Sequence, residues 1–175
     1  RFELRLLAQL PGLPDEDARA AAIEEALAAA VLEPAAEPGS LQFSHALIRE
    51  TLCDEVPPTR RSRLHLHIAA LLEELYRDDP TPVLSALAHH YCAALPGGDA
   101  GKAVEHARRA AERADALFAY EAAASFYRLA LQALESGGDP RARVRLQIAC
   151  ANSLTKAGED PQASEDLLLQ AAKSA

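Results

Sequence analysis

His45 is the side chain whose place in the sequence most suggests a chemical role. It lies in the stretch SLQFSHALIRETL, residues 40–52, where an alternating segment meets one with helical periodicity. Such a histidine is either a junction residue whose ring hydrogen-bonds a backbone carbonyl, or a ligand contact. Arg49 follows one turn later on the same helical face. We expect it to contact another module or an acid elsewhere, because a helix points the adjacent Glu50 away from it.

A dense basic cluster is formed by Arg60, Arg61 and Arg63. It has the charge of a docking patch. Asp54 and Glu55 lie just upstream, however, and can neutralise part of it. We therefore interpret the cluster as a solvated, partly paired helix start.

The cysteines and the HHYC motif do not make a metal site or a catalytic set. His89 and Cys92 stand three apart, but a structural zinc site needs four ligands and no second paired motif complements them. Cys53, Cys92 and Cys150 are too widely spaced for a disulfide framework, which predicts reduced, mostly buried thiols. No nucleophile stands at a useful spacing from a base. We predict no metal, no catalytic residue and no cofactor held by this chain.

Charge is divided unevenly along the chain. Residues 1–56 contain four arginines, no lysine and eleven acids, for a net charge of −7, and residues 57–175 carry −1. The acidic part would repel a phosphate backbone, so we expect no direct contact with nucleic acid. No apolar run approaches the ~20 residues that cross a bilayer, and no secretory signal is present. A cytoplasmic protein that binds no membrane is the expectation.

Residues 1–56 have the pattern of a winged-helix module that lacks its first part. The expected elements are a helix from Asp15 to about Ala30, strands at 31–34 and 41–43 that form a small β-hairpin, and a helix from Ala46 to Glu55. The helix before the wing carries five acids against Arg19 alone, which does not suit DNA. The abrupt start predicts a piece of a longer protein.

Beyond Pro57 the pattern is purely helical, so the fold class is expected to be mainly α. Linking helices are predicted over 57–98, and tetratricopeptide-like helical hairpins, the start of an α-solenoid, over 99–175. Asp99, Asp139-Pro140 and Asp160-Pro161 are predicted helix starts, with the aspartate as cap and proline in the first turn. Ala107, Ala111, Ala123 and Ala130 are expected where paired helices meet.

A family resemblance rests on FSHALIRETLCDEVPPTRRSRLHLHIAALLE, residues 43–73. The stretch resembles the pattern F-x-H-x-L-[IV]-R-E, then R-x-x-L-H, then I-A-x-x-L-E. It is similar to the region after the ATPase module in LuxR-type (MalT-like) transcriptional regulators, which belong to the STAND class of ATPases. Relatives link the same region to an adenylate cyclase or a kinase domain. The resemblance covers roughly residues 1–135.

The resemblance implies an internal, non-catalytic segment that relays nucleotide state and the binding of an inducer or protein partner on the helical arm. The chain contains no GxxxxGK[ST] motif and no basic helix-turn-helix near its end, so ATP or ADP would be bound by the parent protein's own ATPase module. A plain helical-repeat scaffold that binds a protein partner without nucleotide control is the alternative.

For His45 the resemblance implies nucleotide sensing. In related STAND ATPases a winged-helix histidine in an M-H-D-L context reaches the β-phosphate of ADP and holds the inactive state. Ser44-His45-Ala46-Leu47 is similar in sequence and in its place after the wing, with serine for methionine and alanine for aspartate. His45 and, one turn on, Arg49 are therefore the expected nucleotide-sensing residues, without the supporting carboxylate at position 46.

Overall fold

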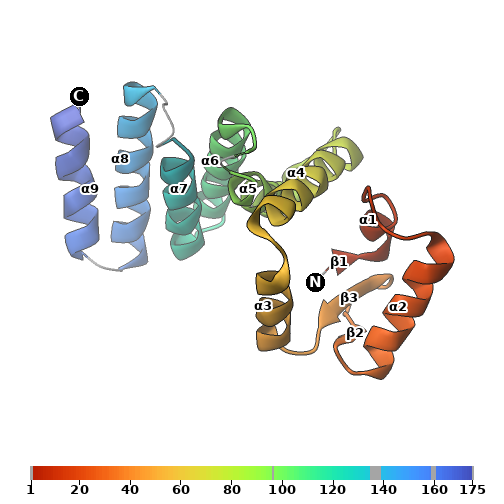
Figure 1. The fold of residues 1–175 in the computed structure, drawn as a ribbon. Coiled ribbons are helices and arrows are strands. Elements are labelled where there is room, and N and C mark those ends of the chain that lie inside the picture. The colour runs from red at the N-terminus through yellow and green to blue at the C-terminus, as the bar shows by residue number, and fades with distance from the viewer. Residues whose placement is uncertain (1, 96, 135–138, 159–160, 175) are drawn as a thin grey trace. The chain divides into compact units, whose positions relative to one another are not determined.

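The chain forms two compact units that divide within one helix. A computed structural model describes all residues except 1, 96, 135–138, 159–160 and 175. Unit 1 comprises Arg1–Leu71 and unit 2 comprises Leu72–Ala175. The boundary falls inside α4 (Pro58–Leu75). The protein is mainly helical, with one small antiparallel sheet in unit 1 (Figure 1).

Unit 1 combines short helices with this sheet. Before α4 its elements are β1 (Phe2–Glu3), α1 (Leu4–Leu7), α2 (Glu16–Ala28), β2 (Leu32–Pro34), β3 (Ser40–Phe43) and α3 (Ala46–Glu55). The predicted helix at 46–55 is confirmed. Asp15 caps α2, because its Oδ1 accepts from the Ala18 N–H at 2.9 Å.

The sheet has three antiparallel strands in the order β1-β3-β2. The predicted hairpin is confirmed, with Leu32 opposite Phe43 and Pro34 opposite Leu41. A strand at Phe2–Glu3 was not predicted, since two residues are too few to show an alternating pattern. Leu32 and Leu41 are the buried apolar residues of the sheet, at 9% and 6% exposed.

Unit 2 is a row of helices. After the end of α4 it contains a 3-10 turn (Thr81–Val83), α5 (Leu84–Ala93), α6 (Ala100–Ala116), α7 (Tyr120–Leu134), α8 (Pro140–Ala157) and α9 (Pro161–Ser174). From α5 onward each helix packs against the next along the chain (Figure 1). Asp99 and Asp139 cap α6 and α8 as predicted, accepting from the N–H groups of Lys102 and Arg141. The third predicted cap, Asp160, lies outside the described residues.

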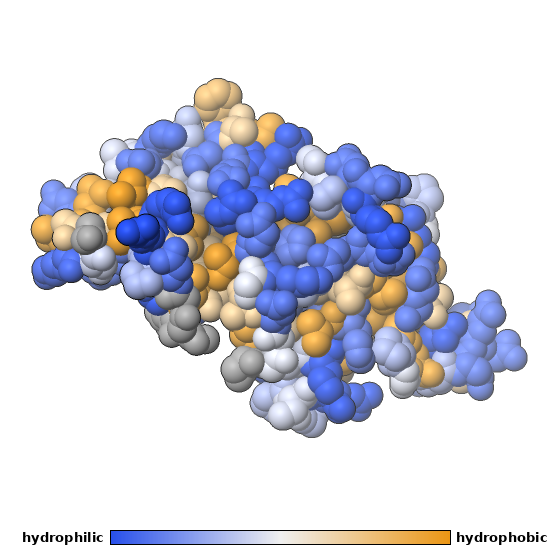
Figure 2. All heavy atoms as spheres, turned by 90° about the horizontal axis from the view of Figure 1, so that it is seen from above, coloured by the Kyte–Doolittle hydropathy of each residue, from blue (hydrophilic) through white to orange (hydrophobic). Residues whose placement is uncertain are grey.

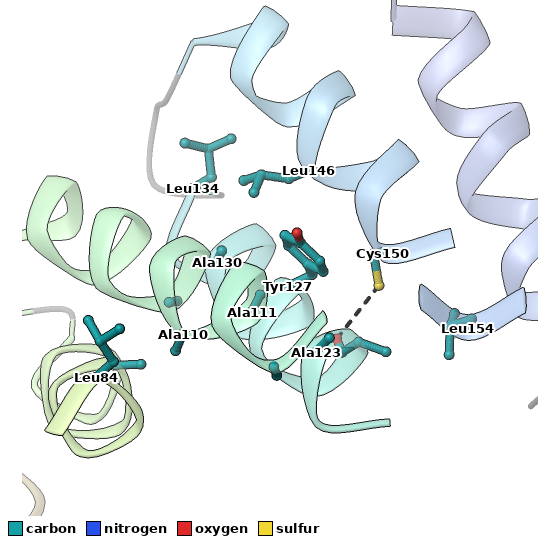
Figure 3. Packing of buried hydrophobic residues seen from close by; sticks show 14 residues of the cluster. Leu84, Ala110, Ala111, Ala123, Tyr127, Ala130, Leu134, Leu146, Cys150 and Leu154 are labelled. Atoms are coloured by element: carbon teal, nitrogen blue, oxygen red, sulfur yellow. Dashed lines mark hydrogen bonds between the residues drawn. The ribbon is translucent and has the colours of Figure 1, made fainter. Parts of the chain in front are cut away.

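Alanine dominates the core of unit 2 (Figure 3). The alanines predicted at the helix contacts are all fully buried: Ala107, Ala111, Ala123 and Ala130. Tyr127, Leu134, Leu146 and Leu154 supply the larger side chains of the same cluster. Cys150 of α8 donates from Sγ to the Ala124 carbonyl of α7 at 3.7 Å. Small side chains thus let neighbouring helices approach closely.

On the face in Figure 2, hydrophilic side chains predominate and apolar ones are interspersed among them. Exposed apolar side chains are normal on a folded protein. Within the described ranges, no helix combines the length and the apolar composition that crossing a bilayer requires.

Enlarging a buried alanine should destabilise unit 2. We expect Ala123→Leu to lower the free energy of unfolding by about 1–3 kcal/mol, because the larger side chain forces α6 and α7 apart. Ala122→Leu, the adjacent and exposed position on the same helix, should change it by less than about 0.5 kcal/mol. Urea unfolding followed by circular dichroism measures both. Equal losses of stability in the two variants would show that close contact between α6 and α7 does not restrict the size of the side chain at position 123.

Candidate functional site

Ser44 holds the junction between β3 and α3. Its Oγ donates to the Ala30 carbonyl at 2.6 Å, and its backbone N–H donates to the Val31 carbonyl at 3.1 Å. Ala30 has a φ of 53°, in the left-handed region, where the chain turns from α2 into β2. These bonds tie the start of α3 to that turn. The backbone that carries His45 is therefore fixed on its N-terminal side.

His45 occupies the cap position of α3 with an exposed imidazole. Its backbone is extended, with φ −139° and ψ 140°, and its side chain does not cap the helix. Across the described residues the ring makes no hydrogen bond, so a backbone carbonyl partner is not seen. The first N–H groups of α3 likewise receive no side-chain cap from His45. An exposed ring at a helix start leaves donors available to an anion.

Arg49 lies beside its neighbour Glu50. Its Nη2 is 3.9 Å from Glu50 Oε1, and both side chains are more than half exposed. The prediction that Glu50 would not be its partner is therefore wrong. The cause is the length of the two side chains, which can bend toward each other over the helix surface although their Cβ atoms point apart. An exposed pair at this distance contributes only about 0–1 kcal/mol. Arg49 remains accessible to a partner.

The basic cluster separates into two parts. Arg61 Nη1 lies 3.5 Å from Asp54 Oδ1 and donates to the Cys53 carbonyl at 3.2 Å. This confirms the predicted pairing with the upstream acids for Arg61. Arg60 and Arg63 have no ion pair within the described part of the chain, so partial neutralisation leaves two of the three guanidinium groups uncompensated.

Unit 2 contains a polar cluster that the sequence did not predict. Glu73, at the end of α4, accepts from Tyr91 Oη at 2.7 Å and from Lys102 Nζ at 2.6 Å through its Oε2. Its Oε1 lies 3.3 Å from His106 Nε2. The rings of Tyr91 and His106 stack with centroids 5.0 Å apart and an interplanar angle of 2°. One carboxylate thus joins three helices.

Electrostatics hold this cluster in defined protonation states. Burial raises the pKa of Glu73, but hydrogen bonds from Lys102, Tyr91 and His106 outweigh it and leave that pKa below its usual value. Burial and then the bond to Glu73 raise the pKa of Tyr91. Burial lowers the pKa of His106, although Glu73 opposes the shift. The cluster therefore contains an ionised glutamate beside a histidine that burial favours as neutral.

The tautomer of His106 follows from this geometry. An ionised carboxylate only accepts, so Nε2 must carry the hydrogen that bonds Glu73. The other ring nitrogen, Nδ1, is buried and has no partner among the described residues. Protonating it would create a buried donor without an acceptor, which is costly. The arrangement is a neutral, oriented imidazole that fastens α4 to α5 and α6.

A second polar contact joins α6, α7 and α8. Ser153 Oγ lies 3.0 and 3.1 Å from the two carboxylate oxygens of Asp115, and Tyr127 Oη lies 3.4 Å from Oδ2. Burial and the Asp115 charge raise the pKa of Tyr127 to about 12. Ser153 is fully buried, so a substrate cannot reach its hydroxyl. This group ties helices together.

The thiols differ in exposure. Cys53 is exposed, so the prediction of burial is wrong for this residue. It lies on α3, none of whose residues is buried. Burial raises the pKa of Cys92 to about 11 and also raises that of Cys150. Both of these thiols stay protonated at neutral pH, which makes them poor nucleophiles and poor metal ligands. His89, the other residue of the HHYC motif considered above, is exposed on α5.

The buried His106 should make unit 2 sensitive to acid. Its pKa is lower in the folded than in the unfolded chain, so the unfolded state binds the proton first as pH falls below about 6.5. The free energy of unfolding should therefore decrease between pH 7.5 and 5.5, and decrease less in His106→Leu. Urea unfolding at the two pH values measures this difference.

Tyr91→Phe serves as the control for this prediction. It keeps the ring that buries His106 but removes the hydroxyl that bonds Glu73. It should lower stability at both pH values and retain the loss on acidification. An unchanged loss in His106→Leu would show that another group causes the acid sensitivity.

Comparison with family models, with curated proteins and with solved structures found no match for this chain. The function is therefore inferred from the chain's own residues. An account of function must explain two features. One is the exposed His45 at a junction that Ser44 holds by hydrogen bonds, and the other is the close packing of the helices of unit 2.

Proposed function

We propose that the chain is a signal-coupling segment of an ATP-dependent transcriptional regulator of the LuxR, MalT-like type. In this proposal residues 1–56 would form the winged-helix module, 57–98 the linking helices, and 99–175 the start of a tetratricopeptide-like sensor arm. The observation that carries the proposal is the exposed, unbonded imidazole of His45 at the start of α3. Ser44-His45-Ala46-Leu47 is similar to the motif around the nucleotide-sensing histidine of that family, with serine for methionine and alanine for aspartate.

His45 would act by donating a hydrogen bond to the β-phosphate of ADP bound in the ATPase module. The first turn of α3 adds backbone N–H groups and the positive end of a helix dipole. Because Ser44 ties the junction to the α2–β2 turn, losing that phosphate contact would release unit 1 as a body. Exchange of ADP for ATP would then allow a hinge-type movement.

The charge of unit 1 supports packing against a protein module over binding to DNA. The helix α2 has Asp15 as its cap and Glu16 and Asp17 in its first turn, and it carries one arginine, Arg19. Non-specific affinity for a duplex depends on cations that displace counterions. An acidic helix before the β2–β3 hairpin is repelled by a duplex. It is better suited to packing between protein modules.

Unit 2 would receive the inducer or a protein partner. Its helices pack in chain order, which is the packing that repeat proteins use to build extended binding surfaces. The same property supports the second candidate function, a scaffold that binds a protein partner without nucleotide control. The equivalent segment of an ATPase-linked adenylate cyclase or kinase would use His45 in the same way and differ only in the effector domain.

Replacing His45 should activate the parent regulator. We expect His45→Ala in the full-length protein to raise basal transcription and to shorten the retention of ADP, since the phosphate loses a hydrogen-bond donor. Reporter expression without inducer and the release of labelled ADP measure the two effects. Glu55→Gln, an exposed change at the other end of α3, is the control and should alter neither. Unchanged ADP retention in His45→Ala would contradict the sensing role.

The opposite change tests the same contact. Ala46→Asp restores the carboxylate of the family motif at the first position of α3, where an acid also favours the helix dipole. It should lengthen ADP retention and lower basal expression.

In addition, the reading frame upstream of Arg1 should encode a GxxxxGK[ST] motif. Its absence would favour the scaffold.

A further inference from the structure

A pocket with basic walls lies in unit 1, between the turn after α1 and the first half of α4. Pro11, Gly12 and Leu13 form one side, and the α4 side consists of Arg60, Arg63, Leu64 and His67. Its volume is about 340 Å³, which is the size of a small-molecule site. None of these residues belongs to α3, so the pocket is separate from His45.

The α4 side has the spacing of a single helical face. Arg60, Arg63, Leu64 and His67 stand at i, i+3, i+4 and i+7, which a helix places in one row. The side chains of Arg60, Arg63 and His67 therefore line the same pocket. Leu64 and, across the pocket, Leu13 are half-buried and give it an apolar wall.

The polar side chains of the α4 side lack the partners that the neighbouring Arg61 has. Arg61 pairs with Asp54 and with the Cys53 carbonyl. Arg60, Arg63 and His67 have no hydrogen bond or ion pair within the described residues. These three side chains have no acidic partner there, although residues 1–56 carry a net charge of −7 and so offer many carboxylates. Like charges one turn apart repel each other, and a bound anion would relieve that repulsion.

We propose that this pocket binds a small ligand that carries an oxyanion, a carboxylate or a phosphate, on an apolar body. The planar guanidinium groups of Arg60 and Arg63 match the paired oxygens of either anion. His67 supplies a third donor. Leu13 and Leu64 contact the apolar body, which distinguishes this ligand from a free inorganic ion. The pocket is independent of the nucleotide contact proposed for His45.

Isothermal titration calorimetry on the 175-residue chain tests the site with defined probes. Hexyl phosphate and hexanoate carry both features, whereas inorganic phosphate and hexanol each carry one. We expect at least one of the two amphiphilic anions to bind with a sub-millimolar dissociation constant. Inorganic phosphate and hexanol should each bind at least tenfold more weakly. The stronger of hexyl phosphate and hexanoate identifies the anion as phosphate or carboxylate.

Two variants of equal charge locate the binding. Arg63→Gln should weaken binding of the preferred anion about tenfold, a typical loss for one charge-assisted contact. Arg61→Gln removes the same charge two positions earlier, from a residue that pairs with Asp54, and should leave the affinity within about twofold. His45→Ala should also leave it unchanged. Circular dichroism confirms that each variant is folded, and amide shifts of Gly12 and Leu13 report the site in the wild-type chain.

Three results would overturn the proposal. Equal losses of affinity in Arg61→Gln and Arg63→Gln would show that the anion is attracted by the net charge alone and not by a contact with Arg63. Equal affinity for inorganic phosphate and hexyl phosphate would show that the apolar wall plays no part. Absence of any binding below millimolar concentration would show that the pocket is not a ligand site.

Discussion

Close approach between helices, made possible by alanine at their contacts, is the constraint on which unit 2 depends. Ala107 and Ala111 of α6 and Ala123 and Ala130 of α7 are fully buried. Each of these side chains buries little apolar area, so the stability of the stack is spread over many small contacts. Short distances between helix backbones also bring polar side chains within reach of the next helix. The contact of Cys150 with the α7 backbone depends on that proximity.

The two units use polar groups in different ways. In unit 2, Glu73 and Asp115 each accept hydrogen bonds from other helices, so their carboxylates hold neighbouring helices together. In unit 1, α2 and α3 contain no buried residue, and hydrogen bonds from Ser44 fix the strand-to-helix junction. His45 and Arg49 of unit 1 are therefore exposed at the surface, whereas His106 and Ser153 of unit 2 are buried.

Local signals in the sequence predicted the helices well, because caps and periodic stripes depend on residues within a few positions of one another. The alanines predicted at helix contacts are fully buried: Ala107, Ala111, Ala123 and Ala130. Glu73 and His106 could not be paired in advance, because 33 positions separate them. The one available signal was that His106 interrupts the run of buried alanines on α6. The pairing of Arg49 with Glu50 likewise depended on side-chain conformation, which spacing does not determine.

The order of the sheet has a consequence for self-association. Because β3 is the central strand, only β1 and β2 offer unpaired backbone groups at the edges. The first of these is two residues long, and the second is three residues long and ends in Pro34, which has no N–H to donate. Short edges and an edge proline are poor templates for strand addition by another chain. The sheet is thus protected against edge-to-edge aggregation, even though little of unit 1 is deeply buried.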